Sequence, residues 1–142
     1  MRKLLTISLL ALAIAQPLWA ETDQEVNARK NALDLAGAFS NDGFKIRDGH
    51  WSGTIQSQQR EVIAVNLYAG NQYWFTAAAS EAKAKVRVDV YDETGRKATA
   101  EMYDSNERAA AGFSPTNSGQ YFIVVTLLEG GPAGVSLICS YK

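Results

Sequence analysis

"GFSPTNSGQYFIVVTLL", residues 112–128, joins a turn to a long apolar run. Pro115 and residues 117–119, Asn-Ser-Gly, favour a reversal of the chain. Beyond the turn, residues 121–128 are apolar at almost every position, so a strand here would have two apolar faces. A strand of that kind is buried on both faces. We therefore interpret the segment as a corner that leads into a core strand, not as a ligand pocket.

An amphipathic helix is predicted near the N-terminus. Residues 22–25, Thr-Asp-Gln-Glu, have the pattern of a capping box. Apolar side chains then recur at roughly helical spacing: Val26, Ala28, Ala32, Leu33, Leu35, Ala36 and Phe39. The turn-forming residues 40–43 follow, which predicts a helix over about 23–39 within an N-terminal segment 21–41. We expect it to cover one face of residues 121–128; a dimer partner is the competing cover, and the helix could instead dock on another protein.

The apolar period changes from helical to two after residue 43. The alternation is clear in residues 63–67, 73–79 and 86–90, which predicts half-buried strands there. Weaker strands are expected near residues 50–55, 96–102 and 108–113. Short strands separated by Gly-, Asn- and Asp-rich turns are typical of antiparallel proteins. We predict a mainly β domain over residues 42–142, an antiparallel sandwich or barrel of about eight strands.

Residues 1–20 have the pattern of a secretory signal peptide. A basic start is followed by an apolar stretch over residues 4–15, and Pro17 and Ala20 fit the region before a cleavage site. The apolar stretch is shorter than the roughly 20 residues that span a bilayer. We predict an exported chain of residues 21–142, periplasmic or extracellular and not membrane-spanning.

Charge and cysteine content narrow the class of protein further. Residues 21–142 contain 12 Lys and Arg against 15 Asp and Glu, a net charge of −3. The two signs are interspersed, as on a solvated surface, and no basic patch indicates a nucleic-acid partner. Cys139 is the single cysteine, so no disulfide can form within the chain and burial must stabilise the fold.

Residues suited to catalysis are few. His50 is the single histidine, and neither a His-Glu-x-x-His nor a Gly-x-Ser-x-Gly motif occurs. A Cys139–His50 pair is conceivable, but Cys139 would share one strand face with Val135, Leu137 and Tyr141, which indicates a buried small hydrophobe. We assign no catalytic residue and expect no enzyme activity. A small secreted enzyme that uses Cys139 and His50 is the alternative.

Two acidic turns offer oxygen atoms of the kind that calcium binds. They are Asp89, Asp92 and Glu93, and Asp104, Asn106 and Glu107. Neither has the alternating ligand order of an EF-hand, and acidic turns are mostly just solvated. No metal site and no cofactor are assigned.

Exposed aromatic side chains are the better candidates for a binding site, and four are assigned: Trp51, Trp74, Tyr91 and Tyr103. An exposed ring can stack on a sugar or fill a pocket in a partner, because it carries a large apolar area with a polar edge. For Trp74 we favour the competing interpretation, a position beneath the N-terminal helix, in the layer that covers residues 121–128.

From about residue 51 to residue 142, the order of motifs resembles the bacterial pre-peptidase C-terminal domain. The motifs are "YAGNQYWF" (68–75), "VRVDVYDETG" (86–95), "FSPTNSGQYFIVV" (113–125) and "VSLICSY" (135–141). The resemblance implies a secreted, jelly-roll-like β-sandwich that acts as a non-catalytic accessory module, with relatives that bind extracellular polymers, some with calcium. Lys83 and Lys85 stand where that family often has acidic residues, which argues against calcium here.

Taken together, the residues and the resemblance predict an exported, non-catalytic binding module. Its ligand would be an envelope protein, a secreted enzyme or a polysaccharide, recognised through surface aromatic side chains. A purely structural, self-associating envelope subunit is a further alternative. Neither the ligand nor the oligomeric state follows from the sequence.

Overall fold

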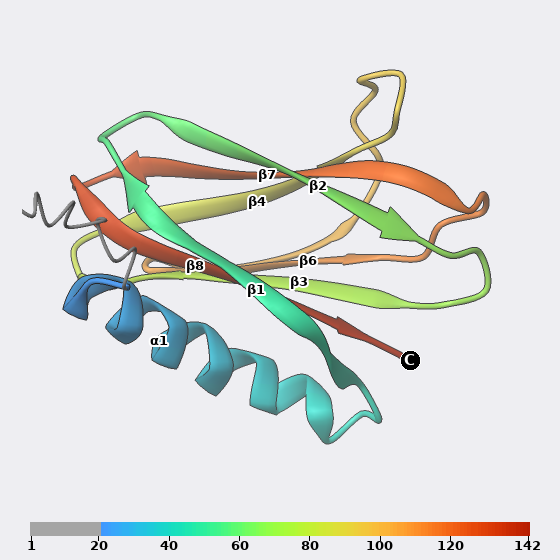
Figure 1. The fold of residues 1–142 in the computed structure, drawn as a ribbon, viewed down its shortest axis with the longest axis horizontal. Coiled ribbons are helices and arrows are strands. Elements are labelled where there is room, and N and C mark those ends of the chain that lie inside the picture. The colour runs from blue at the N-terminus through green and yellow to red at the C-terminus, as the bar shows by residue number, and fades with distance from the viewer. Residues whose placement is uncertain (1–20) are drawn as a thin grey trace, which may run out of the picture.

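The computed structural model describes residues 21–142, apart from the side chain of His50, and contains one helix and eight strands (Figure 1). The elements are α1 (Asp23–Ser40), β1 (Lys45–Ile55), β2 (Arg60–Leu67), β3 (Tyr73–Ala79), β4 (Lys85–Tyr91), β5 (Glu101–Ser105), β6 (Arg108–Phe113), β7 (Gly119–Glu129) and β8 (Ala133–Tyr141). The predicted signal peptide, residues 1–20, lies outside the described residues.

The strands form two sheets that pack face to face. One has five strands in the order β1-β8-β3-β6-β5, and the other has three in the order β2-β7-β4. Every paired strand is antiparallel to its neighbour. Only the β5–β6 connection stays within one sheet, while the other connections between consecutive strands cross from one sheet to the other. The predicted antiparallel β-sandwich with one N-terminal helix is confirmed.

Alternate side chains of both sheets fill the space between them. The rows predicted from the period of two point inward as expected: Tyr73, Phe75, Ala77 and Ala79 on β3, and Val86, Val88 and Val90 on β4. On β7, the inward row is Tyr121, Ile123, Val125 and Leu127. Fully burying a Val, Leu, Ile or Phe side chain contributes about 1.5–3 kcal/mol, so these rows are the main source of stability.

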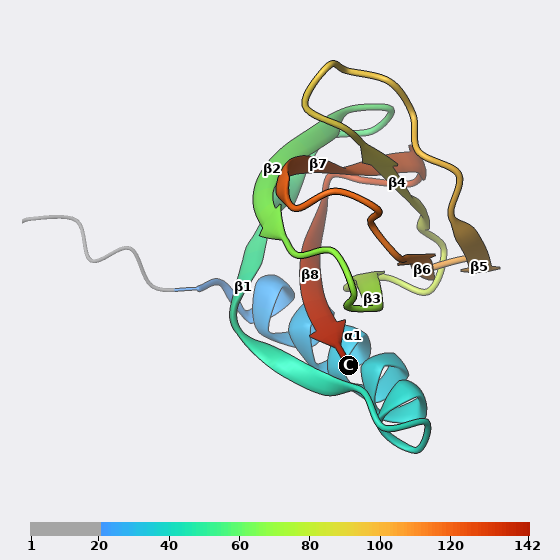
Figure 2. The same ribbon diagram turned by 90° about the vertical axis from the view of Figure 1, so that its right-hand side faces the viewer.

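Helix α1 begins with the predicted capping box. The Glu25 N–H donates to Thr22 Oγ1 at 3.1 Å, and the Thr22 N–H donates to Glu25 Oε2 at 3.4 Å. The buried face of the helix consists of Ala28, Ala32 and Ala36, one residue per turn. This face lies on the outer side of β8 and β3, as Figures 1 and 2 show.

The prediction that the helix covers residues 121–128 is wrong. These residues belong to β7, the central strand of the three-stranded sheet, whereas α1 packs on the five-stranded sheet against Ala78 and Ile138. A helix face made only of alanine fits a floor of small residues. At Gly134 on β8, an added Cβ would lie 2.6 Å from the Gln24 carbonyl carbon, so only glycine lets the helix approach so closely.

Side chains from the two neighbouring strands flank the outer face of β7. Val124 lies between Val62 of β2 and Asp89 of β4 in the register. Val124 is buried, although α1 does not lie on this sheet. The central position of β7 therefore accounts for much of the cover that its two apolar faces require.

One weaker strand also differs from its prediction. The segment expected near 96–102 begins later, because residues 92–96 form a turn and Lys97 makes only an isolated bridge with Tyr91. In that turn, Asp92 Oδ1 accepts hydrogen bonds from the Thr94 N–H and the Arg96 N–H. At the 112–120 corner, the Tyr121 hydroxyl donates to the Asn117 carbonyl at 2.7 Å, as expected of a structural corner.

Candidate functional site: a cleft between β1 and β2

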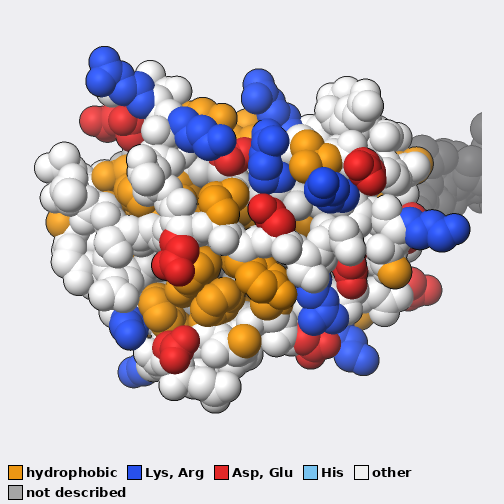
Figure 3. Space-filling view, turned by 180° about the vertical axis from the view of Figure 1, so that it is seen from behind, with side chains coloured by type: hydrophobic (Ala, Val, Ile, Leu, Met, Phe, Trp, Pro, Cys, Tyr) orange, Lys and Arg blue, Asp and Glu red, His pale blue; other side chains and the backbone are white. Residues whose placement is uncertain are grey.

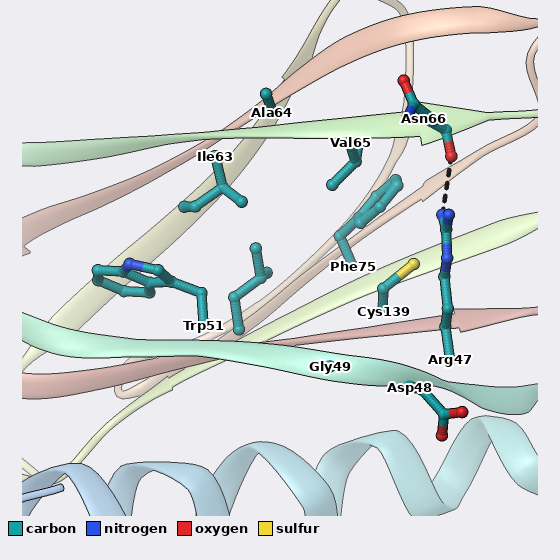
Figure 4. A pocket seen from close by; sticks show the side chains of 11 residues that line it. Arg47, Asp48, Gly49, Trp51, Ile63, Ala64, Val65, Asn66, Phe75 and Cys139 are labelled. Carbon is teal, nitrogen blue, oxygen red and sulfur yellow. Dashed lines mark hydrogen bonds between the residues drawn. The ribbon is translucent and has the colours of Figure 1, made fainter. Parts of the chain in front are cut away.

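The sandwich is open along one side. Strand β1 is an edge of the five-stranded sheet and β2 an edge of the three-stranded sheet, and the two do not pair. A cleft of about 470 Å³ lies between them (Figure 4). The side chains that line it include Phe75, Leu137 and Cys139 on the floor, Ile63 and Val65 on β2, and Trp51 and Arg47 on β1.

A bulge in β1 precedes the strand segment that carries Trp51, and Arg47 lines the cleft at this bulge. Ile46 pairs with Ser140 and His50 with Ile138, so β1 advances four residues while β8 advances two. The extra residues are accommodated where Gly49 has a φ of +85°, a conformation that glycine adopts without strain. Across the bulge, β1 therefore has two more residues than β8. Because side chains alternate along a strand and two is an even number, Arg47 points inward as Trp51 does.

The Arg47 side chain spans the gap between the two sheets. Its Nη1 donates to the Asn66 carbonyl of β2 at 2.8 Å. The neighbouring Asp48 points away from the cleft, toward the helix side (Figure 4). Within the part of the chain that the structure describes, no carboxylate lies within ion-pair distance of Arg47. The guanidinium is thus a half-buried cation that donates to a neutral acceptor, the Asn66 carbonyl.

Trp51 forms the wall nearer the β1–β2 turn. Its indole lies against the backbone of Gly53, where an added Cβ would be 2.7 Å from Cζ2. The ring is half-buried and packs against the core on one side. Trp51 therefore offers a ligand part of a flat apolar surface that is fixed in position by Gly53.

Cys139 forms part of the apolar floor of the cleft and is not suited to act as a nucleophile. Burial raises the pKa of its thiol to about 11, and the charge of the nearby Arg47 only partly opposes this. At neutral pH the side chain is therefore a protonated thiol, the less reactive form. His50 pairs through its backbone with Ile138, and its side chain lies outside the described residues.

The four predicted aromatic residues do not form one site. Trp51 lines the cleft. Trp74 lies beneath the helix, as favoured, with its ring stacked on Phe39 at a centroid distance of 4.2 Å. The layer is different from the predicted one, because it belongs to the five-stranded sheet and not to residues 121–128.

The other two lie on opposite outer faces. Tyr91 is half-buried and pairs with Phe122 on the three-stranded sheet. Tyr103 of β5 is 44% exposed and pairs with Ala110 on the five-stranded sheet. Apolar side chains gather on the far side of the molecule among charged ones (Figure 3). The exposed large apolar residues on β5 are Met102 and Tyr103.

Two carboxylates of the first acidic turn, those of Asp89 and Asp92, already have partners in the protein. Asp89 is 2% exposed and pairs with Arg87 Nε at 2.9 Å and Lys97 Nζ at 3.0 Å. Hydrogen bonds from the Thr94 side chain and then the Arg96 N–H lower the pKa of Asp92. Among the described residues, no group of three His, Cys, Asp or Glu is placed to hold a metal ion.

Arg47 and Asn66 were not predicted from the sequence. The Asp48-Gly49 pair is the only local signal, because it marks a place where a strand can bulge. Asn66 contributes its backbone carbonyl, which no side-chain pattern reveals.

No family model and no curated protein matches the chain. The resemblance to pre-peptidase C-terminal domains therefore stays a prediction. None of the helices in residues 21–142 has the length and apolar character needed to cross a membrane.

Proposed function

We propose that this protein is an exported, non-catalytic binding module that takes its ligand in the β1–β2 cleft. The observation that carries the proposal is the cleft itself, which has an apolar floor, a half-buried tryptophan and an arginine without a carboxylate partner among the described residues. Pockets that combine apolar lining with a few convergent polar groups are the usual form of a binding site.

The two ends of the cleft supply different kinds of interaction. Trp51 offers apolar area at one end, and tryptophan is among the residues that contribute most to binding when partly buried. Arg47 offers a charged donor at the other end, where it can select for an acceptor on the ligand. A ligand that fits must therefore have an apolar part and an acceptor separated along the cleft.

The enzyme alternative is less well supported. A nucleophilic cysteine needs a lowered pKa, and the pKa of Cys139 is raised. A thiol reagent tests this on the native protein. Labelling of the native protein at neutral pH is expected to be slow and to speed up on denaturation, and rapid labelling of the native protein would favour the enzyme.

Binding is tested with the full-length exported protein on immobilised glycans, peptides and envelope proteins. We expect at least one class to bind, and Trp51→Ala or Arg47→Gln to weaken that binding about tenfold, equal to 1.4 kcal/mol. Tyr103→Ala and Arg60→Gln are matched controls, because both side chains are exposed and outside the cleft. Binding that depends on Tyr103 but not on Trp51 would place the site elsewhere.

A further inference from the structure

We propose that the cleft binds an extended peptide, which adds as a strand to the free edge of β2 and pairs an acidic side chain with Arg47. This inference rests on the proposed function, since it names the ligand class of the same cleft. Strand addition to an exposed sheet edge is a known mode of peptide recognition, in which backbone hydrogen bonds give affinity and alternate side chains give specificity.

The free edge of β2 can be assigned residue by residue. The Asn66 carbonyl accepts from Arg47 across the cleft, so it points away from β7. In an antiparallel strand, the N–H and C=O of one residue point to the same side, and the side alternates along the chain. Val62, Ala64 and Asn66 therefore present their backbone groups to the cleft. No described strand pairs with them on that side.

The floor of the cleft fits the side chains of an added strand. Every second side chain of such a strand would point inward, about 6.8 Å from the next inward one. Phe75, Leu137 and Cys139 would meet these side chains, and all three are apolar in character. Inward residues such as Ala and Val therefore match the cleft. A sugar chain would leave the repeating donors and acceptors of the β2 edge without a matching repeat.

Arg47 supplies the charge complementarity. Its hydrogen bond to the Asn66 carbonyl is one that a peptide N–H can replace, which frees the guanidinium for the ligand. The adjacent Asp48 points away from the cleft, and no described carboxylate lies within ion-pair distance of Arg47. The guanidinium therefore suits an Asp or Glu side chain, which it can bind with two parallel hydrogen bonds.

The surface beyond Arg47 indicates that the acid is a side chain and not the peptide C-terminus. A second hollow of about 550 Å³ continues there, lined by Lys45, Tyr68 and Tyr141 among others. A peptide can pass Arg47 and continue into this hollow, so it need not end beside the guanidinium.

The first test uses an array of octapeptides with both ends blocked. Alternate positions are Ala, Val or Ile, and one position near either end is Asp or Asn. We expect Asp peptides to bind about tenfold more tightly than their Asn copies, equal to 1.4 kcal/mol. The difference should vanish in Arg47→Gln and persist in Arg60→Gln, an arginine on the same strand as Asn66.

The second test asks whether the peptide adds as a strand. Two copies of the best binder carry N-methyl groups on alternate amides, one copy on the odd and one on the even positions. Only the copy whose methyl groups face β2 should lose binding. Hydrogen exchange at the amides of Val62, Ala64 and Asn66 should slow when peptide is bound, while Ile63 and Val65, which face β7, serve as internal controls.

The outcomes separate this inference from the proposed function. Trp51-dependent binding of glycans or folded proteins, with no binding of any array peptide, would overturn the peptide inference and leave the binding module standing. Peptide binding that tolerates both N-methylated copies would also overturn it. Absence of any Trp51- or Arg47-dependent ligand would overturn both.

Discussion

Cys139 combines a half-buried position with a cation nearby, which gives the protein a defined alkaline behaviour. Burial raises the pKa of the thiol from 9.0 to about 11. The unfolded chain therefore releases this proton near pH 9, whereas the folded protein keeps it until about pH 11. The stability that Cys139 contributes is complete below pH 9 and decreases as the pH rises from about 9 to about 11.

We expect Cys139→Ala to remove this decrease. Between pH 8.5 and 11, the free energy of unfolding of the native sequence should fall by about 2 kcal/mol more than that of the variant. Urea unfolding at a series of pH values measures both proteins, and titrations of their shared Tyr and Lys residues cancel in the comparison. Parallel curves would show that Cys139 is not buried as described.

Asp89 is the second residue whose surroundings allow a sharp test. Its carboxylate is almost fully buried and has two cations beside it, Arg87 and Lys97. Lys97→Met should cost about 1–2 kcal/mol, because it takes one partner from a buried charge. Asp89→Asn in the same chain should restore most of that stability. Lys85→Met, on the same strand, is the control, and an equal loss there would contradict the assignment.

At the scale of elements, the contact between α1 and the five-stranded sheet depends on small residues. Ala28, Ala32 and Ala36 are buried against the sheet, and Gly134 lies directly under the first turn of the helix. Asn31 adds a fixed point, since its Nδ2 donates to the Ala79 carbonyl at 3.1 Å. The helix is therefore positioned by close backbone approach more than by large apolar side chains.

Two glycine substitutions, one beneath the helix and one within it, should have opposite effects on the stability of the protein. Gly134→Ala should destabilise the protein by about 1–3 kcal/mol, because the new Cβ meets the backbone of Gln24 and Glu25. Gly37→Ala has open space around it within the helix and should stabilise by about 0.5–1 kcal/mol. Thermal unfolding of both variants measures the effects. A neutral Gly134→Ala would mean that the helix moves away at little cost.

The elements differ in how well the sequence predicts them. Local spacing predicts the apolar alternation of Val86, Val88 and Val90 and the capping box at Thr22. Strand β4 and helix α1 are therefore predicted correctly. The floor of the helix is not predicted, because Ala78 and Gly134 are small and give no apolar pattern. The apolar pattern instead predicts that the helix packs on residues 121–128, the segment with the strongest apolar signal.

The cleft could be predicted only in part, because its position depends on how distant strands pair. Trp51 is visible in the sequence as an aromatic residue at a strand end, and it is one of the cleft residues. Which strands become edges, and which edges face one another, depends on the pairing of distant segments. Arg47 reaches the cleft through a bulge, and its partner is a backbone carbonyl of β2. Neither the bulge nor the hydrogen bond to a backbone carbonyl can be predicted from residue types alone.

At the scale of the whole molecule, the predicted cleavage after Ala20 would leave the helix cap in place, because the cap residue is Thr22. Glu21 pairs with Arg29 at 2.9 Å, and Thr22 caps the helix. We expect the exported protein to begin at Glu21, which intact-mass measurement of the periplasmic or secreted material would show. A chain found only in the cytoplasm at full length would contradict export. A cut beyond Thr22 would remove the cap, at a cost of about 1 kcal/mol.

The position of the last strand has a consequence for the order of folding. β8 contains nearly the last residues of the chain, yet it lies between β1 and β3 in the five-stranded sheet. That sheet cannot assemble until β8 has been synthesised, and its distant pairings make folding slow relative to that of locally paired proteins. For a chain that is exported, as the sequence predicts, a delay of this kind would leave time for passage through a secretion channel before the sheet forms. A chain that stops at residue 132 lacks β8 and should therefore stay unfolded, which circular dichroism can measure. If the truncated chain folds, folding does not wait for β8.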